Sequence, residues 1–157
     1  MSAAAANGDA PTVDAHAAAA SAAAPAPKRL IECVVDLRWR DLDALNHVNN
    51  SAFLTYIEEA RLQWFGQLQG PWFGETWMPV VAAVHINYRA QLAWPGRIAV
   101  QLYCERLGKS SLTVAHRIVD ANDAEKLYSD GHTVLVWVNP ADGKSVALPE
   151  SVRKACA

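Results

Sequence analysis

The pattern of hydrophobic and polar positions changes twice between residues 30 and 70. In residues 31–40 the odd-numbered positions are apolar and most even-numbered positions are charged, which predicts a strand with one buried face. In residues 51–69 apolar side chains recur at steps of three and four, which predicts an amphipathic helix with Asn50 or Ser51 as its N-cap. Four strand candidates follow, bounded by turn-forming residues, at about residues 78–90, 96–107, 110–121 and 125–139.

This order of elements predicts an α+β domain. One long helix with a broad apolar face is best buried by a curved antiparallel sheet that wraps around it. A short helix is expected after Pro149. Arg61 falls within the apolar face of the long helix, and we expect its stem to pack while its head reaches water or a carboxylate. Aromatic residues near the helix end predict an apolar pocket there: Trp64, Phe65, Trp72, Phe73 and Trp77.

Residues 1–27 differ in composition from the rest of the chain. They hold 14 alanines and three prolines but neither lysine nor arginine, so we expect a disordered Ala/Pro-rich tail. The tail has the features of neither a secretory signal nor a mitochondrial presequence, and no stretch of the chain approaches the roughly 18 apolar residues of a membrane span. Residues 28–157 are then the folded domain.

The charge of the folded part excludes several classes of function. Residues 28–157 carry 14 basic and 14 acidic side chains, so this part of the chain is neutral. Proteins that bind nucleic acids or anionic membranes need a dense basic face, which a neutral domain does not indicate. The three cysteines form no CxxC motif, so we expect reduced thiols in a cytoplasmic protein. No two histidines have zinc-site spacing, and neither a Gly-x-Ser-x-Gly nucleophile elbow nor a phosphate-binding glycine loop is present.

The loop before the long helix carries the chain's most distinctive residues. Residues 40–50 read Arg-Asp-Leu-Asp-Ala-Leu-Asn-His-Val-Asn-Asn, and residues 56–61 read Tyr-Ile-Glu-Glu-Ala-Arg. Together they resemble the hotdog-fold thioesterases, above all the acyl-CoA thioesterases grouped with 4-hydroxybenzoyl-CoA thioesterase. The His-Val-Asn-Asn run is also similar to that of plant acyl-carrier-protein thioesterases. The resemblance implies a five- or six-stranded antiparallel sheet around a central helix, and dimers with active sites at the subunit interface. It implies neither a metal nor an organic cofactor.

The resemblance also assigns roles to individual residues. The second acid of the Asp-x-Asp pair is Asp43, which becomes the candidate catalytic carboxylate, and the motif histidine is His47. Asn46 stands where many relatives have glycine, although asparagine tolerates a positive φ better than most residues. Leu45 stands where the plant-type enzymes have asparagine, which weakens a triad-like arrangement. With Asn50 added at the helix start, the catalytic candidates are Asp43, His47 and Asn50; the substrate-binding candidates are Asn49, Ser51, Glu59, Lys109, Ser110 and Ser111.

The residue types agree with this chemistry. Thioester hydrolysis needs a carboxylate that activates water or attacks the carbonyl, and donors for the oxygen that becomes negative. The first amides of a helix are unsatisfied and lie at the positive end of its dipole, so a loop that returns Asp43 to the helix start supplies both. Turn formation and helix capping by Asp43 and Asn46 are the alternative role, common for these residue types.

These observations predict hydrolysis of an acyl-CoA thioester by a homodimer or tetramer. An acyl-carrier-protein substrate stays open, although the neutral body offers it no basic patch. Two alternatives remain: an acyl-thioester hydratase or dehydratase, and a non-catalytic acyl-thioester binding protein. The hydratase-type Asp-x-x-x-x-His motif is not found, and the acid that a binding protein would have lost is retained.

Overall fold

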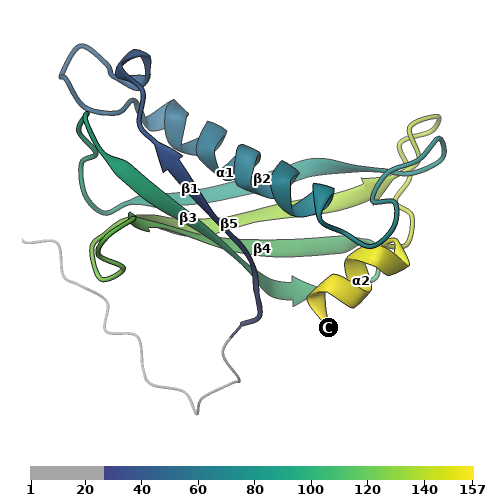
Figure 1. Ribbon diagram of the computed structural model, residues 1–157. Coiled ribbons are helices and arrows are strands. Elements are labelled where there is room, and N and C mark those ends of the chain that lie inside the picture. The colour runs from purple at the N-terminus through teal and green to yellow at the C-terminus, as the bar shows by residue number, and fades with distance from the viewer. Residues whose placement is uncertain (1–26) are drawn as a thin grey trace, which may run out of the picture.

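The computed structural model describes residues 27–157, so most of the predicted tail lies outside the described residues (Figure 1). The elements are β1 (Arg29–Asp36), a 3-10 turn (Trp39–Asp41), α1 (Asn50–Gly66), β2 (Met78–Tyr88), β3 (Arg97–Leu107), β4 (Ser111–Asp120), β5 (Leu127–Val138) and α2 (Glu150–Cys156). The predicted order of one strand, one long helix, four strands and a short closing helix is confirmed. None of the helices in this part of the chain is long and apolar enough to cross a membrane.

The five strands form one antiparallel sheet in the order β1-β3-β4-β5-β2. Helix α1 crosses one face of the curved sheet, and α2 lies beside the far end of α1 (Figure 1). The predicted α+β hotdog architecture is therefore confirmed, with five strands. Strands β1 and β2 are the two edges, and β2 exposes apolar side chains at its free edge: Met78, Val81, Val84 and Tyr88.

The core lies between α1 and the facing side of the sheet. On β4 alternate residues point towards the helix, and Leu112, Val114 and Ile118 are almost fully buried there. Helix α1 buries the side that faces them, through Ala52, Phe53, Tyr56, Ile57, Ala60, Trp64 and Phe65. Leu54, which the helical pattern placed on the buried face, is 42% exposed. The buried face is therefore shifted around the helix relative to the prediction.

Three boundaries differ from the sequence prediction. The N-cap of α1 is Asn49, not Asn50 or Ser51, because the Asn49 side chain accepts the Ser51 amide at 2.9 Å. The helix ends at Gly66, three residues earlier than predicted. Strand β1 ends at Asp36, and Trp39, which the alternation placed on the buried face, is 71% exposed because the chain turns away from the sheet there.

Candidate active site

A tight loop brings Asp43 to the start of α1. An isolated bridge joins Leu42 to Val48 and closes residues 43–47 into a turn. Inside it the Asp43 amide donates to the His47 carbonyl at 2.8 Å, and the Asn46 amide donates to the Asp43 carbonyl at 3.1 Å. Asn46 has a φ of 60°, so asparagine takes the left-handed backbone conformation that usually favours glycine. The turn therefore forms without glycine.

The Asp43 carboxylate has one occupied and one free oxygen. Oδ1 accepts hydrogen bonds from the Leu45 amide at 2.8 Å and the His47 amide at 3.4 Å. Oδ2 has no hydrogen-bond partner among residues 27–157, and the residue is partly exposed. The loop amides thus orient the carboxylate while one oxygen stays available to a substrate or a water molecule.

Asp41, two residues earlier, has a different environment. Its Oδ2 accepts from the Tyr56 hydroxyl at 2.7 Å and from Arg38 Nε at 3.0 Å, and its side chain is 8% exposed. Burial would raise the pKa of Asp41, but the hydrogen bonds from Arg38 and Tyr56 outweigh it, so the pKa lies below its usual value. Asp41 ties the loop to the middle of α1.

The start of α1 offers one free backbone amide among the described residues. The Asn49 side chain accepts both the Ser51 amide at 2.9 Å and the Ser51 hydroxyl at 2.7 Å, so the Ser51 N–H is already used by the cap. The Asn50 N–H has no acceptor among the described residues. The candidate oxyanion donor is therefore the Asn50 amide, at the positive end of the α1 dipole.

A cavity of about 470 Å³ joins these groups. It is lined by Asp43, Leu45, His47, Val48, Asn49, Asn50, Phe53, Tyr88, Arg89, Ala90, Gln91 and Leu92. All three catalytic candidates and one substrate-binding candidate, Asn49, lie on its wall. Ser51 is not part of this wall, because its side chain turns back to the cap.

Sequence reasoning missed the second wall of the cavity, residues 88–92. Tyr88 donates its hydroxyl hydrogen to the Asn50 carbonyl at 3.1 Å, and its ring meets Phe53 edge-on at 5.2 Å. Arg89 forms two hydrogen bonds of 3.0 Å with Asp130, which fixes the end of β2 against β5. Because this contact depends on the long-range pairing of β2 with β5, the local sequence pattern could not indicate it.

The other substrate-binding candidates lie elsewhere in the chain. Glu59 is exposed on α1 and accepts from Gln63 at 3.0 Å. The turn that holds Lys109, Ser110 and Ser111 is fixed to α2, since Arg153 donates to the Lys109 carbonyl at 2.7 Å. In Figure 1, α2 lies at the opposite end of α1 from the Asp43 loop. A single chain therefore does not bring these residues to the Asp43 cavity.

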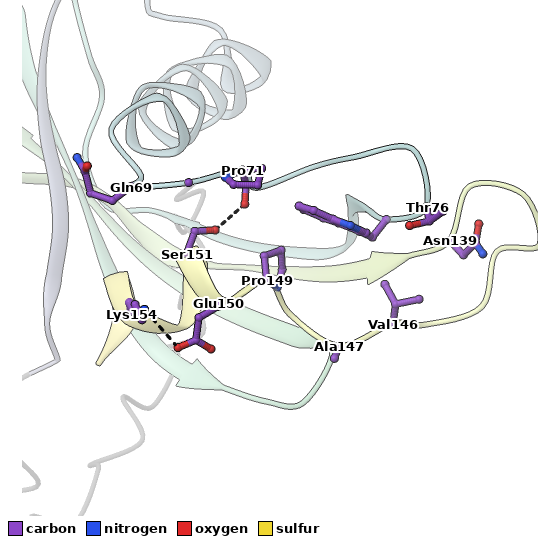
Figure 2. Close-up of a pocket in the computed structure, with 12 residues that line it drawn as sticks. Gln69, Pro71, Thr76, Asn139, Val146, Ala147, Pro149, Glu150, Ser151 and Lys154 are labelled. Atoms are coloured by element: carbon purple, nitrogen blue, oxygen red, sulfur yellow. Dashed lines mark hydrogen bonds and ion pairs between the residues drawn. The ribbon is translucent and has the colours of Figure 1, made fainter.

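A larger cavity than this one, of about 660 Å³, lies beyond the C-terminal end of α1 (Figure 2). Its walls come from the segment after α1, the segment after β5 and α2. The Ser151 hydroxyl donates to the Pro71 carbonyl at 2.6 Å, and Lys154 lies 3.9 Å from Glu150. Trp77 lines this cavity, so the expected apolar pocket near the helix end exists, although Trp72 instead stacks on Phe65 at 4.5 Å. None of the catalytic candidates reaches it, so size does not mark the active site.

The remaining reactive side chains form no competing site in residues 27–157. No group of three or more potential metal ligands occurs there. Cys33, Cys104 and Cys156 are free, and burial raises the pKa of the Cys33 thiol. His116 is 1% exposed, and neither ring nitrogen has a hydrogen-bond partner in the part of the chain that the structure describes. Burial lowers the pKa of His116 to about 4, so the ring is neutral at physiological pH.

Comparisons with known proteins show the family of the chain. The profile of the Thioesterase-like superfamily matches residues 37–156, which include the loop, both walls of the cavity and all strands but β1. A solved structure of a proposed acyl-CoA thioesterase from Xanthomonas campestris is 43% identical, with 76% of this chain and 99% of that chain covered and a TM-score of 0.69. A proposed thioesterase from Pseudomonas aeruginosa is 38% identical over 83% of this chain and 100% of that chain, with a TM-score of 0.77.

A relative with a named activity is consistent with this family. The long-chain acyl-CoA thioesterase FadM of Escherichia coli is 26% identical over 127 residues, which cover 76% of this chain and 92% of that protein. The chain therefore belongs to the thioesterase-like superfamily, and it is a thioester hydrolase.

Proposed function

We propose that the protein hydrolyses acyl-CoA thioesters to the free acid and CoA, with Asp43 as the catalytic carboxylate. The observation that carries this proposal is a pair of unused groups in one cavity: the free Oδ2 of Asp43 and the free amide of Asn50. Membership of the thioesterase-like superfamily and the relatives' acyl-CoA activities support the substrate class.

The two groups divide the reaction between them. The thioester oxygen accepts the Asn50 N–H, which stabilises the negative charge as the carbonyl carbon is attacked. Asp43 either removes a proton from the attacking water or attacks the carbon itself to form a mixed anhydride that water then opens. In both routes the carbon–sulfur bond breaks, the sulfur leaves as a thiolate that takes up a proton, and the acid is released.

His47 has a supporting role in this proposal. Its amide donates to Asp43 and its carbonyl accepts the Asp43 amide, so the residue holds the loop that orients the carboxylate. Its side chain also lines the cavity, where it can orient substrate or assist proton transfer. We rank it second to Asp43.

A second copy of the chain is part of the proposed active enzyme. Lys109, Ser110 and Ser111 remain candidates for binding the pantetheine or phosphates of CoA, and they can reach an Asp43 cavity only from another subunit. Dimerisation through an edge strand would bring such distant elements together across the interface.

A panel of acyl-CoAs and enoyl-CoAs tests the reaction type. The proposal expects release of free thiol from acyl-CoAs across a chain-length and aryl series, scored by kcat/KM. Hydroxyacyl-CoA formed from enoyl-CoA without thiol release would instead indicate a hydratase. Tight binding of acyl-CoA with neither product would indicate a binding protein.

A further inference from the structure

Two of the three free cysteines lie where the C-terminal helix meets the sheet. Cys104 is on β3, and Cys156 is the last residue of α2. Helix α2 contacts β3 and lies at the end of that strand in Figure 1. Both cysteine side chains pack against the core between α1 and the sheet. Two cysteines that meet from separate elements are candidates for a cross-link, provided that the backbone holds them close together.

Hydrogen bonds hold the backbones of these two cysteines side by side. The Cys104 amide donates to the Lys28 carbonyl at 2.9 Å. Lys28 Nζ in turn donates to the backbone oxygen of Ala157, the residue after Cys156, at 2.5 Å. The end of β3 and the end of α2 are therefore tied to the same lysine, one through its carbonyl and the other through its side chain.

The two thiols also interact directly. Burial, and after it the hydrogen bond with Cys104, raises the pKa of the Cys156 thiol to about 12. The Cys156 sulfur therefore keeps its proton at physiological pH. Because the thiolate is the reactive form of cysteine, Cys104 is the sulfur of this pair that an oxidant attacks first.

The third cysteine cannot join this pair. Cys33 is opposite Val100, which lies four residues from Cys104 along β3. Four residues of a strand span about 13 Å, whereas the Cα atoms of a disulfide lie within about 7 Å of each other. Cys33 is also 5% exposed, and its thiol donates to Gln63 Oε1 at 3.1 Å. Cys104 and Cys156 are both partly exposed, so a small oxidant can reach them.

We propose that Cys104 and Cys156 form a disulfide when the protein meets hydrogen peroxide, and that this bond fastens α2 to the sheet. The peroxide converts the Cys104 thiolate to a sulfenic acid and releases hydroxide, which takes up the proton that Cys104 has lost. The Cys156 sulfur then attacks the Cys104 sulfur. The S–S bond forms as the S–O bond breaks, and the hydroxyl leaves with the Cys156 proton as water. Two thiols thus lose two electrons, and one peroxide becomes two water molecules.

The disulfide fixes a helix that supports another part of the fold. Arg153 of α2 donates to the carbonyls of Gly108 and Lys109, at 3.0 and 2.7 Å, and so holds the turn between β3 and β4. Helix α2 is short and ends the chain, and chain ends are the first parts to loosen unless they are tied down. A covalent bond at Cys156 ties down the last residue of α2. Oxidation therefore stabilises this end of the domain.

The test oxidises the full chain with hydrogen peroxide and maps the products. Tryptic digestion without reductant should give residues 98–106 joined to residues 155–157, two hydrogens lighter than the separate peptides together. Residues 30–38, which contain Cys33, should keep a free thiol. The melting temperature should rise by at least about 5 °C, because the disulfide restricts the unfolded chain. Dithiothreitol should reverse this rise.

Three variants distinguish the pair from general oxidation. Cys104→Ser and Cys156→Ser should each abolish both the joined peptide and the rise in melting temperature. Cys33→Ser keeps a donor for Gln63 and should show both. The joined peptide of the wild type is measured without any variant, so it decides the matter even if one variant does not fold.

Three results would overturn the inference. The first is a wild type in which Cys104 and Cys156 remain thiols, or become sulfinic acids, after oxidation. The second is a disulfide that joins two copies of the chain on a non-reducing gel. The third is the expected joined peptide without a rise in melting temperature, which would show that the bond does not stabilise α2.

Discussion

At the scale of residues, the side chains of two aspartates two positions apart have different environments. Asp41 is buried and receives hydrogen bonds from Tyr56 and Arg38, whereas Asp43 keeps one free oxygen on a cavity wall. The hydrogen bonds of Asp41 tie the loop to α1 and leave it a structural environment. Sequence alone placed both acids in a turn, and only the resemblance to thioesterases singled out Asp43. The environment that separates them depends on Tyr56, fifteen residues further along the chain.

His116 should make the stability of the protein depend on pH. An unfolded histidine binds a proton below its ordinary pKa of 6.5, whereas His116 in the fold stays neutral down to about 4. The free energy of unfolding should therefore fall as the pH decreases from 6.5 to about 4, by on the order of 3 kcal/mol.

His116→Leu is the variant that checks this prediction. Leucine cannot titrate, so urea denaturation at a series of pH values should give a flatter stability curve for the variant than for the wild type. Parallel curves for both proteins would contradict the assignment to His116.

At the scale of elements, the sequence predicted the number, type and order of helices and strands. Alternation indicated β1, turn-forming residues separated β2 to β5, and the steps of three and four between apolar residues indicated α1. Boundaries and the helix cap were less accurate, since Asn49, Asn50 and Ser51 are all good capping residues and only the Asn49 side chain meets the helix amides. The wall at residues 88–92 and the separation of Lys109 from Asp43 arise from strand pairing, which a local pattern does not contain.

The pairing of β2 with β5 depends on a glycine. Gly131 has a φ of +152°, and a Cβ there would lie 2.1 Å from the His85 carbonyl oxygen and 2.9 Å from His116 Cε1. Because the first neighbour is backbone, β2 would have to move. We expect Gly131→Ala to destabilise the protein by more than about 3 kcal/mol, the upper end of the cost of an unfavourable backbone conformation alone.

Gly143→Ala is the matched control in thermal and urea unfolding. Gly143 also has a positive φ, of +69°, but nothing lies within 4 Å of its added Cβ. It should therefore cost only about 1 kcal/mol, the backbone strain itself. Equal losses for both variants would show that the contact with His85 is unimportant.

At the scale of the whole molecule, the open edge of β2 predicts self-association. Val84 is 45% exposed on this edge, beside unpaired backbone groups. We expect light scattering at micromolar concentration to give at least twice the 17.0 kDa of one chain. Val84→Lys should shift the protein towards the monomer, whereas Val34→Lys on the opposite edge strand, β1, should not. A wild-type monomer would contradict the prediction.

The Ala/Pro-rich tail is proposed to contribute to neither fold nor catalysis. Its composition offers little apolar surface to offset the entropy of ordering it. Deletion of residues 1–27 should leave the melting temperature and acyl-CoA turnover nearly unchanged. A several-fold loss of kcat/KM in the truncated protein would assign the tail a role.

The central claim is that Asp43 supplies the catalytic carboxylate, and the most direct test is kcat/KM of Asp43→Asn beside Asp41→Asn on the best acyl-CoA. Asparagine keeps the oxygen that accepts the Leu45 amide, so Asp43→Asn should fold with an unchanged melting temperature and lose about 100- to 10,000-fold in rate. Asp41→Asn should do the opposite: it loses the charged partner of Arg38 and Tyr56, so it should melt earlier but retain activity while folded. The account would be contradicted if Asp43→Asn kept more than about a tenth of wild-type kcat/KM while Asp41→Asn abolished activity.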